Sequence, residues 1–239
     1  MRALRAQVLL CLALCVIIPC LGGYLLASGD IVPVMQEPIY AGPPDTPRIA
    51  LTVNVDWGEE YIPELLAVSK KEKFLMTFFI TGRWADKFPE LVRQIHRAGH
   101  EIGNHAYSHA HPDKLSVEEN LDEIERTAVV LARITGQKTT LFAPPYGERG
   151  PAVLEAAEAS GHRTILWTID GIDWQHPPAD KIVARVLNRA CNGAIVLLHP
   201  TEQTVHALPV IVSGLRQRGF EPVTVSQMLG LDNEGGAER

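Results

Sequence analysis

The sequence predicts an α/β domain of parallel strands joined by helices, and two observations lead to this expectation. From residue 48 onward, short apolar runs alternate regularly with amphipathic stretches. About seven strand–helix units can be counted in this way, and strands connected through helices run parallel. The periodicity allows either a closed barrel or an open, doubly wound sheet, so both architectures remain open on this pattern.

The expected strands are short apolar runs. The run 49–55 predicts a buried first strand, and the aromatic-rich run 74–80 predicts the second. After the first strand stands Val55-Asp56-Trp57-Gly58 instead of a glycine-rich phosphate loop, which argues against a nucleotide site. The remaining expected strands span 101–103, 139–142, 163–167, 194–198 and 221–224.

The expected helices begin and end at recognisable signals. The helix 89–98 starts with proline in its first turn and ends at Gly99. The helix 117–135 is preceded by Ser116, and Glu119 three residues later completes a capping box. The remaining expected helices span 62–71, 151–160, 179–190 and 204–218.

The N-terminus has the pattern of a membrane signal anchor. Arg2 and Arg5 precede an uncharged apolar run over 8–27, which would span roughly 30 Å as a helix. The arginines favour a cytoplasmic N-terminus, with the following domain outside. A cleaved signal peptide is the alternative, but Leu25 stands where cleavage requires a small residue. We therefore expect a signal anchor over 1–29, and both alternatives export the domain.

Composition divides the rest of the chain into a linker, a domain and a tail. Several prolines stiffen the expected linker 30–47, the domain spans 48–232, and 233–239 form a polar tail. Of the four cysteines only Cys191 lies in the domain, which excludes an internal disulfide and a thiolate zinc site there. A net charge of -6 argues against nucleic acid as a partner, and no feature specifies an oligomeric state.

Polar residues follow several expected strands at the end where parallel architectures gather functional groups. His105 and His109 lie four residues apart in a polar loop beside Asn104, and Asp56 follows the first strand. Two imidazoles and a carboxylate would leave positions on zinc open for water and substrate. Loop histidines with ordinary hydrogen bonds are the alternative interpretation.

Other strand-end residues also allow two interpretations. His199 directly follows four apolar residues and is either a core histidine bonded to backbone or a proton-transfer group. Asp173 could orient a catalytic group, cap the next helix or face solvent, while Trp174 and Tyr146 could line a pocket or pack in the core. His100, at the end of a helix, is expected to be a turn or cap residue.

Five motifs occur in a specific order: Asp56, Gly103-Asn104-His105-xxx-His109, Pro144-Pro145-Tyr146-Gly147, Asp170-xx-Asp173-Trp174 and Leu197-x-His199. This ordered set resembles the polysaccharide deacetylase family (carbohydrate esterase family 4, the NodB homology domain). The resemblance covers roughly 48–230. It implies a distorted parallel (β/α) barrel and hydrolysis of N-acetyl groups from an aminosugar polymer.

The resemblance also implies roles for individual residues. A divalent metal, expected to be zinc, would be held by Asp56, His105 and His109. The backbone N–H of Tyr146 would help hold the oxyanion, and His199 would protonate the departing amine while Asp173 orients its ring. The substrate pocket would be lined by Trp174, Leu197, Pro144 and Pro145.

Two departures from the family pattern concern the general base. Asn54 stands where the family has a basic aspartate, and an amide cannot take a proton from water near neutral pH. Ala143 replaces the arginine that braces this base. Three outcomes remain open: Glu59 or Glu60 replaces the base, the metal activates water without one, or the domain only binds.

Together these features predict a membrane-anchored, metal-dependent hydrolase of cell-wall aminosugar polymers, such as peptidoglycan or a chitin-like glycan. A catalytically degenerate domain that binds glycan or a protein partner is the alternative. The stretch 55–60 is also similar to a sporulation-associated branch of the family.

Overall fold

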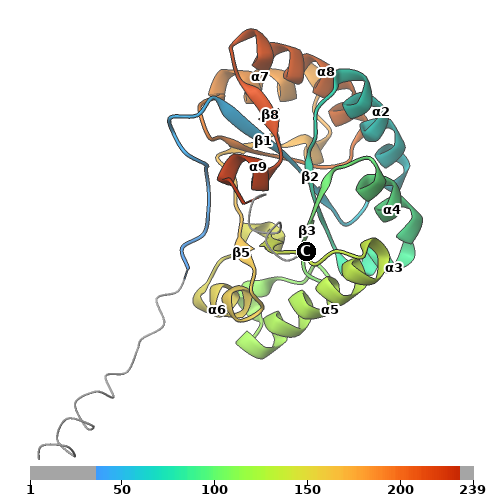
Figure 1. The fold of residues 1–239 in the computed structure, drawn as a ribbon, viewed down its shortest axis with the longest axis vertical. Coiled ribbons are helices and arrows are strands. Elements are labelled where there is room, and N and C mark those ends of the chain that lie inside the picture. Colours follow the sequence, from blue (N-terminus) through green and yellow to red (C-terminus); the bar gives the residue numbers. More distant parts are fainter. Residues whose placement is uncertain (1–35, 232–239) are drawn as a thin grey trace, which may run out of the picture. The chain divides into compact units, whose positions relative to one another are not determined.

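Eight strands form one sheet in the computed structural model, in which residues 36–231 are described (Figure 1). All the strand pairings are parallel, which confirms the expected architecture. The strands are β1 (Arg48–Val55), β2 (Thr77–Ile80), β3 (Glu101–Asn104), β4 (Leu141–Phe142), β5 (Arg163–Thr164), β6 (Ile169–Asp170), β7 (Ile195–Leu198) and β8 (Glu221–Val223).

The order of the strands distinguishes a barrel from a doubly wound sheet. The strands follow one another as β5-β4-β3-β2-β1-β7-β6, with β8 paired to the first residues of β1. This is the order of a ring in which β1 lies between β2 and β7, whereas a doubly wound sheet reverses its order at a switch point. Within the described residues no pairing joins β5 to β6, so the sheet is an incomplete, curled barrel.

The segment that precedes β1 contacts strands near the two ends of this open ring. Ile39 forms a parallel bridge with Ile165, just after β5, and Ala41 forms an antiparallel bridge with Ala194, just before β7. This part of the chain is therefore held on the sheet by backbone hydrogen bonds, although its prolines predict a linker.

The predicted membrane anchor, over 1–29, and the tail 233–239 lie outside the described residues. Within 36–231, no helix combines the length and the apolar character that crossing a bilayer requires. The anchor therefore stays a prediction from the sequence.

Helices surround the strands in Figure 1. The capping box of Ser116 and Glu119 is confirmed, and Gly136 ends the same helix in the left-handed conformation, at φ 77°. The short elements α3, α9 and β6 and the four 3-10 helices η1 to η4 have no counterpart among the expected ones. The helices are η1 (Glu59–Tyr61), α2 (Ile62–Glu72), α3 (Gly82–Lys87), α4 (Pro89–Arg97), η2 (Pro112–Lys114), α5 (Val117–Thr135), η3 (Pro145–Gly147), α6 (Pro151–Ala159), η4 (Asp173–Gln175), α7 (Ala179–Arg189), α8 (Glu202–Gln217) and α9 (Val225–Leu229).

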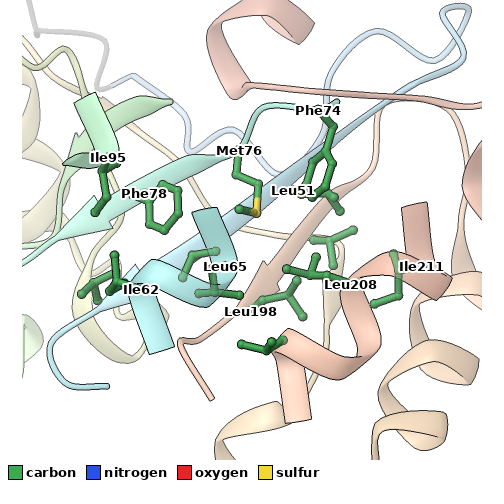
Figure 2. Packing of buried hydrophobic residues seen from close by; sticks show 14 of the residues in the cluster. Leu51, Ile62, Leu65, Phe74, Met76, Phe78, Ile95, Leu198, Leu208 and Ile211 are labelled. Carbon is green, nitrogen blue, oxygen red and sulfur yellow. The ribbon is translucent and has the colours of Figure 1, made fainter. Parts of the chain in front are cut away.

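Successive residues of β1 face two different apolar layers. Leu51 and Val53 belong to a cluster that includes core residues of α2 and α8 (Figure 2). Ala50 belongs to a second cluster, with Phe79 of β2 and residues of α9, inside the curl of the sheet. Because side chains alternate along a strand, Asn54 faces the same inner side as Ala50. The polar residue at the end of β1 is therefore directed into the barrel.

His100 has the expected cap role at the end of α4, because its backbone N–H donates to the carbonyl of Ile95 at 3.3 Å, and its ring is also buried in the core. Its ring Nδ1 accepts a hydrogen bond from the backbone N–H of Met76 at 3.0 Å, and its Nε2 lies 3.0 Å from the Ser69 hydroxyl. Burial lowers the pKa of His100 to about 4. Ser69 lies on α2 and Met76 just before β2, so the local sequence pattern around His100 could not predict these contacts of its ring.

The buried His100 should make the stability of the protein depend on pH. In the unfolded chain a histidine titrates at a pKa of about 6.5. Below this pH the unfolded state takes up a proton that the folded state excludes until about pH 4. The free energy of unfolding should therefore fall between pH 6.5 and 4, by about 3 kcal/mol from this residue.

Urea denaturation at several pH values would measure this loss of stability in wild type and in His100→Asn. The variant should have a smaller pH dependence than wild type in this range. His96→Asn, at the partly exposed histidine four residues earlier, is the matched control and should keep the wild-type slope. Equal slopes in His100→Asn and wild type would contradict the assignment.

Candidate functional site

A cavity of about 500 Å³ opens where the strands of the barrel end. Most of its lining residues follow the carboxyl ends of β1, β3, β4, β6 and β7, as the strand-end pattern predicts. The structure therefore brings together polar residues from distant parts of the chain. The lining consists of Asn54, Asp56, Trp57, His105, His109, Tyr146, Trp167, Asp170, Trp174, Leu197 and His199.

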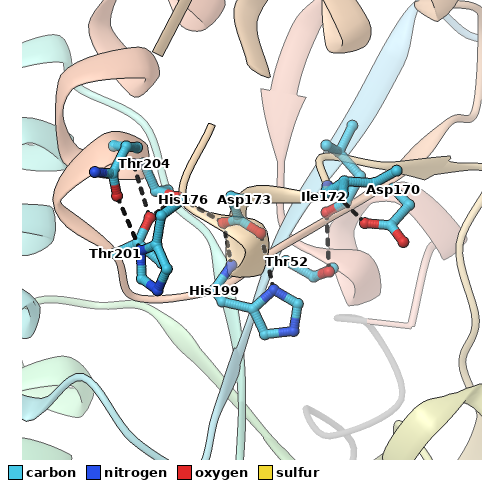
Figure 3. A network of polar contacts seen from close by, with 10 residues as sticks. Thr52, Asp170, Ile172, Asp173, His176, His199, Thr201 and Thr204 are labelled. Carbon is cyan, nitrogen blue, oxygen red and sulfur yellow. Dashed lines mark hydrogen bonds and ion pairs between the residues drawn. The ribbon is translucent and has the colours of Figure 1, made fainter. Parts of the chain in front are cut away.

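His199 is held by a buried carboxylate behind the cavity (Figure 3). One oxygen of Asp173 lies 2.9 Å from Nδ1 of His199, and the other accepts from the backbone N–H of His199 at 2.5 Å. The hydroxyl of Thr204, at the start of α8, also donates to Asp173, at 2.5 Å. Because an ionised carboxylate only accepts, Nδ1 carries the hydrogen, and Nε2 is free to exchange a proton in the cavity.

Asp173 itself does not line the cavity, since its side chain is completely buried. Three donors satisfy the carboxylate, so its burial is compensated. His199 bonds to a carboxylate and faces the cavity, which excludes the interpretation as a core histidine bonded to backbone. On its open side the ring lies parallel to that of Trp57, at a centroid distance of 6.0 Å and an angle of 3°.

His105 presents one nitrogen to the cavity in a defined protonation state. Its Nδ1 lies 2.6 Å from the carbonyl oxygen of Ala143, which can only accept, so the hydrogen is on Nδ1 and the lone pair on Nε2. Complete burial, and then the neighbouring His109, lower the pKa of His105 to about 3. The two rings lie 5.0 Å apart at 73°, and burial also lowers the pKa of His109.

Asp56 is held by an arginine that the motifs do not include. One carboxylate oxygen accepts from the hydroxyl of Thr81 at 2.9 Å and from Nε of Arg83 at 2.7 Å. The other oxygen pairs with Nη2 of Arg83. The hydrogen bond to Asp56 raises the pKa of Arg83 above its already high ordinary value. The arginine lies three residues past the end of β2. Among the strands of four or more residues, β2 is the one after which the sequence predicted no site residue.

The donors fit a divalent metal ion in kind. A carboxylate and two neutral imidazoles are suitable ligands, and the bond of His105 to a backbone carbonyl is the support that metal-bound histidines commonly have. Yet within residues 36–231 no three His, Cys, Asp or Glu side chains are close enough together to enclose an ion. The carboxylate of Asp56 is paired with Arg83 instead.

The two departures from the family pattern lie where the base would act. Asn54 lines the cavity, whereas Ala143 packs in the apolar cluster inside the barrel. Neither Glu59 nor Glu60 belongs to the cavity lining, so the structure does not support a replacement base from this pair. The pocket role expected for Pro144 and Pro145 is not seen either, because both are buried outside the lining.

Backbone strain is concentrated around the cavity. Of the six non-glycine residues with positive φ in the described part of the chain, all but Lys73 lie in the loops after β3, β4 and β6. They include His109 at φ 56° and Tyr146 at φ 59°. This conformation costs about 1–3 kcal/mol for a residue with a side chain, and such residues cluster at functional sites.

Comparison with known proteins identifies one family. A family model described as polysaccharide deacetylase matches residues 41–165. The chain is 36% identical over 196 residues to the uncharacterized protein YlxY of Bacillus subtilis, covering 82% of this chain and 61% of that protein's length. It is 32% identical over 200 residues to a peptidoglycan-N-acetylglucosamine deacetylase of Bacillus cereus, covering 82% and 73%.

Solved structures agree with this assignment. BA3943 of Bacillus anthracis, described as a CE4 family pseudoenzyme, superposes with a TM-score of 0.80 at 37% identity, covering 82% of this chain and 70% of that chain. A BA3943 mutant described as having restored enzymatic activity superposes equally well, at 35% identity, covering 82% and 72%.

The buried carboxylate should set the tautomer of the His199 ring. In Asp173→Asn an amide NH2 faces one of the three donors, which should destabilise the protein by about 1–3 kcal/mol for each buried donor left unpaired. Nitrogen-15 NMR of the His199 ring should detect a change from hydrogen on Nδ1 alone to a mixture of tautomers.

Asp170→Asn is the control, since Asp170 lines the same cavity but accepts one backbone N–H, that of Ile172, at 2.8 Å. It should leave the His199 ring spectrum unchanged. If both variants gave the wild-type ring spectrum, Asp173 would not orient His199.

Proposed function

Because this chain belongs to the polysaccharide deacetylase family, a family of hydrolases acting on N-acetyl groups, we propose that it deacetylates a cell-wall aminosugar polymer, peptidoglycan in particular. The observation that carries this proposal is the pair of His199 and Asp173 at the cavity. In proton transfer, a carboxylate buried behind a histidine orients the imidazole and stabilises its protonated form. Simple binding of a glycan requires no such pair.

The residues around the cavity divide the reaction between them. A zinc ion at Asp56, His105 and His109 would supply the Lewis acidity that activates water and polarises the acetamide carbonyl. The backbone N–H of Tyr146 would stabilise the negative charge that develops on the carbonyl oxygen. As the C–N bond breaks, Nε2 of protonated His199 would give its proton to the departing amine, with Asp173 stabilising the imidazolium.

Catalysis by this site would be slow, because Asn54 cannot accept a proton from the attacking water. A general base contributes about 10²–10⁴-fold to the rate of such reactions. The proposed enzyme therefore retains the general acid, His199, and lacks a general base.

The rim of the cavity supports a glycan as the ligand. Three of the six exposed large apolar side chains in the described residues surround it, namely Trp57, Tyr146 and Trp174. Exposed apolar side chains that gather at one place on a soluble protein commonly mark a binding site. Aromatic rings with polar edges suit a ligand such as a sugar, which presents both apolar and polar faces.

A second candidate function is glycan binding without hydrolysis. It is favoured by Asn54, by Ala143 and by the pairing of Asp56 with Arg83. The similarity to a protein described as a pseudoenzyme supports it as well. In both functions the partner is an N-acetylated aminosugar polymer, and the two differ in whether acetate is released.

The proposed location is the outer side of the cell membrane, with the domain anchored through its N-terminal segment. The basic and apolar pattern of that segment supports this location, as does the cell-wall substrate in the names of relatives. A role in sporulation remains a narrower proposal from the stretch 55–60.

Restoring the base and its brace together should raise the rate of hydrolysis. The full-length double variant Asn54→Asp/Ala143→Arg, loaded with zinc, should release acetate from N-acetylglucosamine oligomers about 10²–10⁴-fold faster than zinc-loaded wild type. Ala143→Arg alone should destabilise the protein, because it places a guanidinium in an apolar cluster without a carboxylate. Asn54→Asp should relieve this cost when the two changes are combined.

His199→Ala in the double variant is the control and should abolish the gain. Acetate release by wild type, measured together with binding of the oligomers by calorimetry, separates the two candidate functions. Acetate release by wild type above the level of its His199→Ala variant supports the enzyme, and binding without any release supports the second candidate. An unchanged rate in the double variant would contradict the assigned base and brace.

A further inference from the structure

The geometry points to Arg83 as an internal competitor of the metal ion for Asp56. The guanidinium would keep the site in a stable metal-free form and would have to leave before an ion binds. This inference rests on the metal site of the proposed function and adds a residue that controls its occupancy.

The first argument is the number of acceptor positions on the carboxylate. An ionised carboxylate has about four lone-pair positions. Thr81 uses one on the first oxygen, and Arg83 uses one on each oxygen. A forked pair of this kind is among the strongest hydrogen-bonded contacts in proteins, because both partners are charged and planar. Little acceptor capacity is left for a metal ion.

The second argument is charge. Asp56 is largely buried, with 11% of its side chain exposed, so its negative charge is only weakly screened by water. Arg83 already neutralises this charge. A divalent ion bound beside the guanidinium would add two positive charges next to one, and like charges at this range repel. The metal ion and the guanidinium therefore exclude each other.

Arg83 is placed so that it can withdraw. Half of its side chain is exposed, so the guanidinium can move into solvent without crossing packed structure. Its backbone stays fixed, because its N–H donates to the carbonyl of Tyr107 at 3.0 Å. The charge of Glu123 also raises the pKa of Arg83, so a second carboxylate lies within electrostatic range. A withdrawn arginine would thus remain at the rim of the site.

The opposite role, in which Arg83 orients Asp56 for a metal ion, would leave one oxygen free. Residues that orient a metal ligand strengthen metal binding, and their loss typically weakens it about 10–100-fold. Here the arginine contacts both oxygens. The two roles therefore predict changes of opposite sign in zinc affinity when the arginine is removed.

Zinc affinity of the full-length protein, purified in detergent, tests the inference by competition with a chromogenic chelator. Arg83→Gln removes the charge and the fork, so it should bind zinc about tenfold or more tightly than wild type. Arg83→Lys keeps the positive charge but loses the forked hydrogen bonding, so its zinc affinity should lie between those of wild type and Arg83→Gln. Metal-free Arg83→Gln should also melt at a lower temperature than wild type, since Asp56 loses its partner.

Arg93→Gln is the matched control, because Arg93 is similarly exposed and paired to a carboxylate, that of Glu90 on α4. It should change neither zinc affinity nor the melting temperature by much. His105→Ala should abolish zinc binding in the Arg83→Gln background, which locates the ion. Equal or weaker zinc binding by Arg83→Gln, or no zinc binding by any variant, would overturn the inference. Tight zinc binding without acetate release would leave it standing and would count against the proposed hydrolysis alone.

Discussion

The burial of β1 on both faces is the constraint on which the rest of the structure depends. Its neighbours β2, β7 and β8 all pair with it, so its residues alternate between the layer under the helices and the interior of the barrel. This alternation directs Asn54 inward and places Asp56 at the mouth of the cavity. A shift of register by one residue would exchange the two faces and dismantle both core and site. The chemistry of the site is therefore tied to the packing of a single strand.

Much of the fold follows from patterns that act within one element. The long helix α5 was predictable because its cap, apolar face and terminal glycine are all local signals. Two-residue strands such as β4 and the six-residue helix α3 are too short to establish a periodicity, so their bounds depend on tertiary pairing. The burial of His100 likewise depends on Met76 and Ser69, which come from other elements.

The candidate site was likewise predictable only where its residues follow from the pattern of the strands. His105, His109 and His199 each follow a strand, and parallel strands end at one edge, so their convergence could be foreseen. The pairing of Arg83 with Asp56 could not be, because it depends on which strands are adjacent and on the direction of a long side chain. The same holds for the carbonyl of Ala143, which reaches His105 because β4 lies beside β3.

The two halves of the site differ in how they could change during evolution. On the acid side, Asp173 is buried and shared by three donors, so the loss of any partner would leave an uncompensated polar group. On the base side, Asn54 and Ala143 are both neutral, and replacing only one by its charged counterpart would bury an unpaired charge. The base and its brace can therefore be lost or regained together at little cost to stability. Asp56, the carboxylate that remains at the end of β1, forms an ion pair with Arg83, so the metal-free site carries no unpaired charge at this position.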